Sequence, residues 1–228
     1  MAELILALDL PDRDEALRLL DKLDGALGWC KVGMEMFTHY GPQLLAELAS
    51  RKLKIFLDLK FYDIPHTVAQ AVMQTCSLGV DLLTVHCQGG QRMLEACIAA
   101  RNDRGKKPLL FGVTVLTSFA AGEMPGITAQ PQDFARSLAA LALTCGLDGI
   151  VCSPQEVRDI KHDYPGLACL CPGIRPAWAG LGDQRRVATP GQAVAWGADY
   201  LVVGRPILKA KDPRDALLRI GEEMSRPF

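Results

Sequence analysis

Several kinds of segment are missing from this chain of 228 residues. No apolar run is long enough to span a bilayer. Glu3 stands where a signal peptide carries Lys or Arg, and the first apolar run ends at Asp9, so we expect no targeting segment and a cytoplasmic location. Polybasic runs are also missing and the net charge is −1, which argues against general binding to nucleic acid or to a membrane.

The spacings typical of metal sites are missing too, although the chain has eight cysteines. No two of them form a CxxC pair, and most lie inside apolar runs. Buried thiols in a reducing compartment therefore account for them better than disulfides or metal ligands.

What the sequence does contain is a regular alternation of short β-rich runs and helical patterns. The predicted strands are 4–10, 29–33, 54–60, 81–86, 109–116, 148–153, 167–174 and 199–204. Apolar residues at three- and four-residue steps predict helices over 13–23, 41–50, 67–79, 90–100 and 131–146. Eight βα units without a linker predict one α/β domain over residues 1–228, a (β/α)8 TIM barrel, with an open doubly wound sheet as the alternative.

Three of the predicted strands begin in the same way. The stretches GVDLLTVH, GLDGIVCS and GADYLVVG each contain a helix-ending Gly, an Asp and then a buried strand. We attribute this recurrence to a shared turn between helix and strand rather than to a sequence repeat.

Charged residues stand at the ends of the first three predicted strands. Side chains alternate along a strand, so Asp58 and Lys60 share one face, opposite to the neighbouring Ile and Leu residues. Asp9 and Lys31 have the same phase on the first and second strands. One charge at a strand end is usually solvated, but four in phase on three strands predict an active site at the mouth of a barrel.

The types of charge at this position suggest a reaction. Nearby carboxylates favour the charged form of Lys60, which suits it to donate a proton rather than to form a Schiff base. Asp58 would repel an anion: two unit charges about 4 Å apart interact by roughly 4 kcal/mol at an effective dielectric near 20. A substrate carboxylate held beside Asp58 would escape this repulsion by leaving as CO2, and Lys60 could protonate the carbanion left behind.

The ends of the last two predicted strands indicate a phosphate site. Gly173 and Gly204 allow backbone N–H groups to approach an anion, and Arg175 and Arg205 can bind it through two N–H groups each. Phosphate sites of TIM barrels commonly lie in the loops after strands seven and eight. The long segment 175–189 is rich in Gly, Gln and Arg, as expected of a closing loop.

Some polar residues have two interpretations. Thr117 and Ser118 could bond a polar ring or cap a turn. Asp63 could belong to the site or form the N-cap of a helix that begins near Pro65. We interpret His86 as a packing or hydrogen-bonding residue rather than a metal ligand.

Together these motifs resemble the orotidine 5'-phosphate decarboxylase family. LDLKFYDIPHTV fits the Asp-x-Lys-x-x-Asp-Ile-Pro signature of that family, and ALDL, KVG, VTVLTS, PGIR, GDQRR and VGRPI match its other motifs in the same order. The resemblance covers nearly the whole chain. It implies a TIM barrel that converts orotidine 5'-monophosphate (OMP) to UMP in pyrimidine biosynthesis, with no metal and no organic cofactor.

The resemblance also implies roles for particular residues. Asp9 and Lys31 would hold the ribose hydroxyls. The pyrimidine would contact Thr117 and Ser118. The resemblance further implies a network of alternating charges, formed by Lys31, Asp58, Lys60 and Asp63. It also implies four residues that bind the phosphate or close over it, namely Arg175, Gln184, Gly204 and Arg205. The protein would be a homodimer in which Asp63, Ile64 and Thr67 complete the partner's site.

Two alternatives remain open. Magnesium-dependent relatives such as 3-keto-L-gulonate 6-phosphate decarboxylase and hexulose phosphate synthase share the Asp-x-Lys-x-x-Asp strand, but they carry an acidic metal ligand where this chain has Lys31. A non-catalytic sensor of sugar phosphates would keep Arg175 and Arg205 but would have no need of Lys60.

Overall fold

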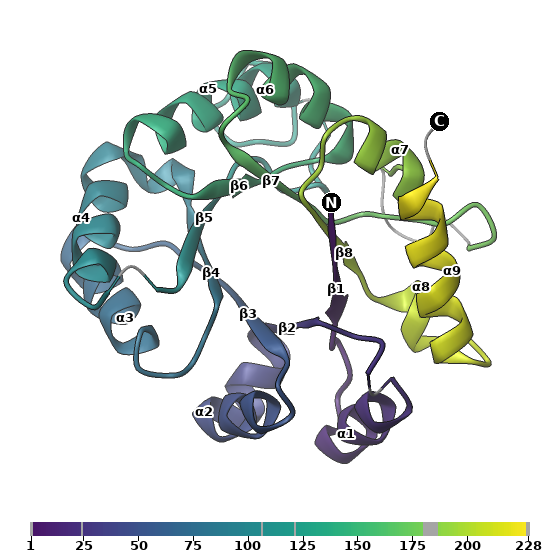
Figure 1. Cartoon of the computed structure of the whole chain (residues 1–228). Coiled ribbons are helices and arrows are strands. Elements are labelled where there is room, and N and C mark those ends of the chain that lie inside the picture. The colour runs from purple at the N-terminus through teal and green to yellow at the C-terminus, as the bar shows by residue number, and fades with distance from the viewer. Residues whose placement is uncertain (1, 24, 106, 121, 180–186, 227–228) are drawn as a thin grey trace.

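The strands form a closed ring, seen along its axis in Figure 1. The computed structural model describes residues 2–23, 25–105, 107–120, 122–179 and 187–226. Its parallel strands pair in sequence order and β8 pairs back with β1, which confirms the barrel and excludes the open sheet. The strands are β1 (Glu3–Ala7), β2 (Trp29–Gly33), β3 (Lys54–Phe61), β4 (Leu82–His86), β5 (Leu109–Val113), β6 (Gly149–Val151), β7 (Ala168–Cys171) and β8 (Tyr200–Val203).

Helices surround this ring on its outer side (Figure 1). They are α1 (Arg13–Lys22), α2 (Met34–Ser50), α3 (Pro65–Thr75), α4 (Gly90–Asn102), α5 (Pro131–Thr144), α6 (Val157–Asp163), α7 (Pro190–Ala195), α8 (Arg205–Leu208) and α9 (Pro213–Ser225), with short 3-10 turns at Cys87–Gly89 and Pro154–Glu156. Over the described ranges, none of these helices has the length and apolar character needed to cross a membrane.

Local sequence explains where several helices begin. The Asp12 carboxylate accepts a hydrogen bond from the Glu15 N–H at 2.7 Å, and Asp212 caps α9 in the same way. Helix α2 begins seven residues earlier than the predicted 41–50, because a second helical segment precedes a kink at Gly41. Gly41 has φ 60°, in the left-handed region that glycine tolerates best.

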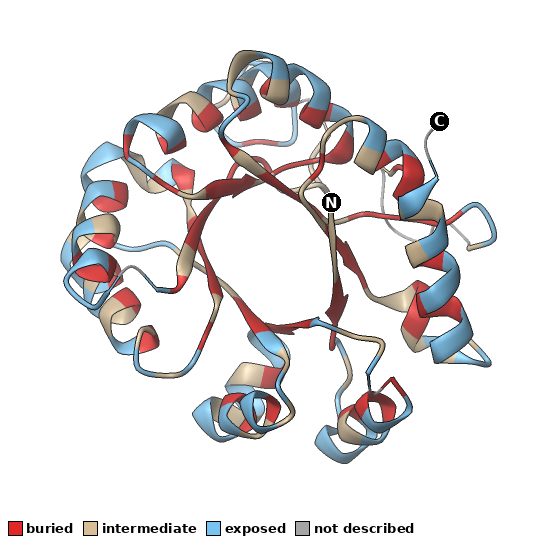
Figure 2. Cartoon of the chain, viewed as in Figure 1, coloured by how far each residue is buried: buried red, intermediate tan, exposed pale blue. Residues whose placement is uncertain are grey.

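Alternation along the strands divides the apolar residues into two cores. The outer core lies between the strands and the helices, and Figure 2 shows buried residues on the strands and on the barrel-facing sides of the helices. The inner core fills the barrel itself with Ile5, Ala7, Trp29, Phe56, Leu82, Phe111, Leu170 and Val202. Edge-to-face contacts of Tyr200 with Trp29 and Phe111, each with ring centroids 5.7 Å apart, fill the barrel near the N-terminal ends of its strands.

Three aspartates join neighbouring strands at this N-terminal edge. They are Asp81, Asp148 and Asp199, and each directly precedes a strand, β4, β6 and β8 respectively. Their carboxylates accept backbone hydrogen bonds from the preceding strand, from Ile55, Leu110 and Cys169 respectively, at 2.9, 2.8 and 2.7 Å. Each also meets a cation, namely Lys107 for Asp81, Arg101 for Asp148 and Lys161 for Asp199. The shared turn inferred from the recurring Gly-x-Asp pattern is therefore confirmed.

The eight cysteines are free, and all except Cys76 are buried. Burial raises the pKa of Cys30, Cys87 and Cys97 to about 12. These thiols are therefore protonated at neutral pH and pack as small apolar groups.

Candidate active site

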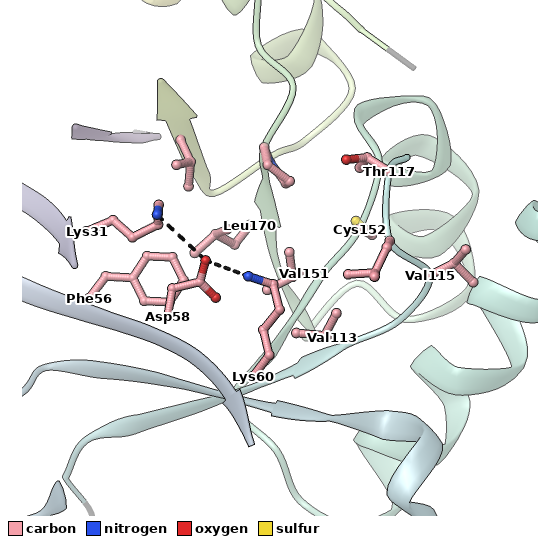
Figure 3. A pocket seen from close by; sticks show the side chains of 13 residues that line it. Lys31, Phe56, Asp58, Lys60, Val113, Val115, Thr117, Val151, Cys152 and Leu170 are labelled. Atoms are coloured by element: carbon pink, nitrogen blue, oxygen red, sulfur yellow. Dashed lines mark hydrogen bonds and ion pairs between the residues drawn. The ribbon is translucent and has the colours of Figure 1, made fainter. Parts of the chain in front are cut away.

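A row of alternating charges crosses the mouth of the barrel. Lys31 Nζ lies 2.9 Å from Asp9 Oδ1 and 3.8 Å from Asp58 Oδ2, and Lys60 Nζ lies 2.8 Å from the same Asp58 oxygen. Figure 3 shows Asp58 between the two ammonium groups. The four residues predicted from strand phase are therefore brought together, with carboxylate and ammonium groups in alternation.

Strand register explains why these charges point inward. Lys31 pairs with Phe56, an inner-core residue, and Asp58 lies two positions further along β3 on the same side. Gly33 leaves space beside them, because a Cβ at this position would lie 3.0 Å from Lys31 Nζ and 3.5 Å from Asp9 Oδ1. This role of Gly33 was not predicted, although a glycine two residues after Lys31, on the same side of the strand, was the available signal.

The end of β3 is irregular where it carries Lys60. Pairing with β4 passes from Leu57 opposite Leu83 to Phe61 opposite Val85, so β3 has two more residues than β4 in this interval. Lys60 itself has φ 51°, in the left-handed region that non-glycine residues rarely adopt. The lysine therefore reaches the cavity from a strained backbone position and not from a regular strand.

One buried hydroxyl beside these charges was not predicted from the sequence. Thr84 Oγ1 lies 3.0 Å from Asp58 Oδ1 and accepts a hydrogen bond from the Lys60 N–H, also at 3.0 Å. Thr84 is fully buried. A threonine in the middle of an otherwise apolar strand was the signal that could have identified it, because buried hydroxyls require partners.

An apolar cavity opens on one side of the charge row (Figure 3). Besides Lys31, Asp58 and Lys60, its walls consist of Phe56, Val113, Val115, Leu116, Thr117, Val151, Cys152, Leu170, Pro172 and Val202. Thr117 is thus among the lining residues, whereas Ser118 is exposed and is not. Such a cavity suits a flat ring with its charged substituent directed at the row.

A second cavity continues from the charge row toward the loops after β7 and β8. It shares Lys31, Asp58, Lys60, Pro172 and Val202 with the first, and it adds Ala7, Asp9, Gly173, Arg175, Gly204, Arg205 and Leu208. Arg175 is buried, with 8% of its surface exposed, and donates a hydrogen bond to the Ile174 carbonyl at 2.8 Å. Two guanidinium groups beside one cavity favour an anionic ligand.

The two glycines of this cavity have different structural roles. Gly173 has φ 77°, which brings the backbone after β7 into a conformation that other residues rarely adopt. Gly204 lies against β1, since a Cβ there would be 3.4 Å from the Ala7 Cβ and 3.9 Å from Asp9 Oδ2. The cavity therefore depends on small residues at both strand ends.

Comparisons with known proteins agree with this geometry. The sequence model of the family described as orotidine 5'-phosphate decarboxylase / HUMPS matches residues 2–220. The chain belongs to this family. It is 47% identical to the orotidine 5'-phosphate decarboxylase of Pseudomonas fluorescens over 225 residues, with 97% of each chain covered. It is 48% identical to the enzyme of that name from Nitratidesulfovibrio vulgaris over 231 residues, covering 99% of this chain and 98% of the relative.

A solved structure of the same family has the same fold. The crystal structure of orotidine 5'-phosphate decarboxylase from Lactobacillus acidophilus superposes with a TM-score of 0.87 at 34% sequence identity, covering 99% of this chain and 100% of the other. The resemblance inferred from the motifs is therefore confirmed at the level of family and fold.

Three residues that the family resemblance assigned to a partner lie on the surface. Asp63, Ile64 and Thr67 are exposed at the start of α3, and none of them lines the two cavities. Asp63 is not the N-cap of α3, because Ile64 occupies that position and Asp63 Oδ1 instead accepts from the Ile64 N–H at 2.6 Å. The interpretation of Asp63 as an ordinary helix cap is therefore wrong. Gln184, predicted at the phosphate, lies outside the described residues.

His86 ends β4 beside the charge row. Its ring packs against Tyr62, with centroids 5.6 Å apart, and within the described ranges its Nδ1 has no hydrogen-bond partner. Burial lowers the His86 pKa, the Lys60 charge lowers it further, and Asp58 opposes them. Its imidazole is therefore neutral at neutral pH. In the part of the chain that the structure describes, no three His, Cys, Asp or Glu side chains are grouped so as to hold a metal ion.

Proposed function

We propose that this chain catalyses the decarboxylation of OMP to UMP in pyrimidine biosynthesis. The observation that carries the proposal is the row of Asp9, Lys31, Asp58 and Lys60 between an apolar cavity and a cavity with two arginines. OMP has the matching sequence of groups: a flat pyrimidine with a carboxylate at C6, a ribose and a phosphate.

In the proposed complex each part of the nucleotide occupies one part of the site. The phosphate binds Arg175, Arg205 and the backbone at Gly204, and Gln184 contacts it from the loop. The ribose hydroxyls bind Asp9 and Lys31. The pyrimidine enters the apolar cavity, where Thr117 and Ser118 supply polar contacts. Contacts to the phosphate and the ribose, which lie away from C6, would then provide the binding energy that holds the carboxylate near Asp58.

The chemical step uses Asp58 and Lys60. The bond between C6 and the carboxylate breaks, CO2 leaves, and the electron pair remains on C6. The Lys60 ammonium, 2.8 Å from Asp58, transfers a proton to C6 and is reprotonated from solvent. Because these charges are fixed before the reaction begins, they stabilise the carbanion without reorganisation.

Lys31 favours this reaction over that of the magnesium-dependent relatives. Its ammonium is buried, with 8% of the residue exposed, and stands between Asp9 and Asp58. A cation at this position repels Mg²⁺ and occupies the acidic groups that would otherwise bind it. We therefore propose catalysis without a metal and without an organic cofactor.

A second copy of the chain would complete the site. Met34, Tyr62 and Ile64 are exposed apolar residues that follow the adjacent strands β2 and β3. Burying them in a homodimer would bring Asp63, Ile64 and Thr67 toward the partner's cavity, and Asp63 would extend the partner's charge row. The eight free thiols support our further proposal that the protein works in the reducing cytosol.

The first test is an ultraviolet assay of OMP turnover in the presence of a chelator. We expect turnover to persist, because no step uses a metal. Turnover that stops on chelation and returns with Mg²⁺ would favour the metal-dependent alternative. Binding of OMP without any turnover would favour the sensor.

The second test mixes two inactive variants, Lys60→Ala and Asp63→Ala. One of the two sites in a mixed dimer would contain both Lys60 and Asp63, so activity should return when subunits exchange. A labelled-subunit measurement must show that exchange occurs. Exchange without recovered activity would contradict the shared site.

A further inference from the structure

Thr84 occupies a central position on the inner side of β4. It lies two residues after Leu82, which belongs to the inner core, and two residues before His86. Its whole surface is buried, yet its neighbours along the strand are apolar. A hydroxyl in this position requires partners within the protein, and it finds them at the charge row.

The Thr84 hydroxyl joins two parts of β3. Its Oγ1 donates to Asp58 Oδ1 and accepts from the Lys60 N–H, each at 3.0 Å. The second oxygen of that carboxylate, Asp58 Oδ2, binds the Lys60 ammonium at 2.8 Å. The two Asp58 oxygens are thus divided between a neutral donor and the reacting cation, which fixes the orientation of the carboxylate.

The backbone of Lys60 requires such support. Its φ of 51° lies in the left-handed region, and the β3 ladder is interrupted between Leu57 and Phe61. Strained backbone conformations persist where surrounding contacts determine them. The hydrogen bond from the Lys60 N–H to Thr84 is a contact of this kind, made at the residue whose side chain donates the proton in the proposed reaction.

We propose that Thr84 is a positioning residue for the decarboxylation, which holds Asp58 and the Lys60 backbone in the geometry that proton transfer requires. This inference rests on the proposed roles of Asp58 and Lys60. Thr84 acts through these two residues, since it is absent from the walls of both cavities.

Substitution by valine or by serine distinguishes the role of the Thr84 hydroxyl from the role of the side-chain shape. Thr84→Val keeps a β-branched side chain of similar size but can neither donate nor accept, whereas Thr84→Ser keeps the hydroxyl. Thr114→Val is a matched control. Thr114 is equally buried, and its hydroxyl donates to the Val151 carbonyl at 2.9 Å, an oxygen that also accepts from the Thr114 N–H.

The experiment measures single-turnover rate, KM, UMP affinity and urea unfolding for these variants. In Thr84→Val we expect the single-turnover rate to fall roughly ten- to a hundredfold, the size of effect that a small misplacement of catalytic groups produces. KM and UMP affinity should stay within about threefold, because the phosphate and ribose contacts are intact. Thr84→Ser should recover the rate to within about threefold, and Thr114→Val should keep the wild-type rate.

Several results would overturn the inference. A Thr84→Val protein with the wild-type rate would do so, as would an equal loss of rate in Thr114→Val. If Thr84→Val does not fold, Thr84→Ala and Thr84→Ser are compared instead, and equal rates in those two would exclude a role of the hydroxyl. Lys60→Ala distinguishes this failure from failure of the proposed function: an inactive Lys60→Ala beside a fully active Thr84→Val rejects only the positioning role.

Discussion

At the N-terminal edge of the barrel, Asp81, Asp148 and Asp199 each accept a backbone hydrogen bond and face one cation. At the C-terminal edge, Asp9 and Asp58 also face cations, but both of them line a cavity. The two edges therefore contain the same kinds of charged group in different environments. Charges that contact only neighbouring protein groups hold strands together. Charges that also line a cavity remain able to act on a ligand.

Among the cations, Arg101 and Lys60 show the same difference. Arg101 is buried, with 5% of its surface exposed, against Asp148 at the N-terminal edge. The Lys60 side chain keeps 27% of its surface exposed at the mouth, although it binds Asp58 at 2.8 Å. We expect substitutions at the two edges to change different quantities, stability at one and turnover at the other.

The largest effect is expected for Lys60→Ala at the mouth. This change removes the proposed proton donor and leaves Asp58 without its nearest cation. We expect kcat to fall by about 10⁴-fold, the upper end of what positioned proton transfer contributes. UMP affinity and urea unfolding, measured on the same protein, should change little. Near-normal turnover would remove Lys60 as the acid.

The corresponding change at the N-terminal edge is Asp148→Ala. It leaves the buried Arg101 without its partner, so we expect a loss of about 3 kcal/mol in the free energy of unfolding. Assayed well below its melting temperature, this variant should keep the wild-type kcat. Glu222→Ala is the control, because the ion pair of Glu222 with Arg226 is exposed and should contribute little. Equal stabilities of the two variants would contradict the division between the edges.

Arg205→Ala tests the second cavity at the mouth. A hydrogen bond to a charged group contributes about 1.5–3 kcal/mol, so we expect KM for OMP to rise by roughly ten- to a hundredfold. Steady-state kinetics with OMP varied from below to above KM would detect this change. An unchanged KM would place the phosphate elsewhere.

The smallest expected effect is the contribution of His86 to the loss of stability at low pH. Because burial and Lys60 lower the His86 pKa below its usual value of 6.5, the unfolded chain binds a proton more readily than the folded one. The contribution of this residue to the free energy of unfolding is thus fully present above pH 6.5, and it decreases as the pH falls toward the lowered pKa. Between pH 7.5 and 5.5, wild type should lose more unfolding free energy than His86→Gln in urea titrations. Parallel losses would exclude this contribution.

Much of the fold was predictable because strand periodicity and the Gly-x-Asp turns report local geometry. The ends of the strands were less predictable. The predicted strand 109–116 is regular only to Val113, and Val115 and Leu116 beyond it line the mouth. The short helices α6, α7 and α8 were not indicated, because helical periodicity needs a window of about 11–18 residues. The extent of the chain as one domain stays a prediction.

The site was predictable where it follows strand alternation, as for Lys31 and Asp58. Lys60 was also predicted from this alternation, but the left-handed φ from which its side chain reaches the row was not. A threonine in an apolar strand indicates a buried hydroxyl, but the partners of Thr84 were not predictable because they depend on the register between β4 and β3. The roles of Ser118, Gln184 and the partner's Asp63 stay predictions.

The pairing of β1 with β8 has a consequence for synthesis of the protein on the ribosome. Asp9 follows β1 and is synthesised well before Arg205, which follows β8, yet both line one cavity. A nascent chain that stops short of β8 has no closed ring and lacks the Gly204 and Arg205 side of this cavity. The proposed phosphate site therefore forms only when the last strand has emerged and docked beside the first.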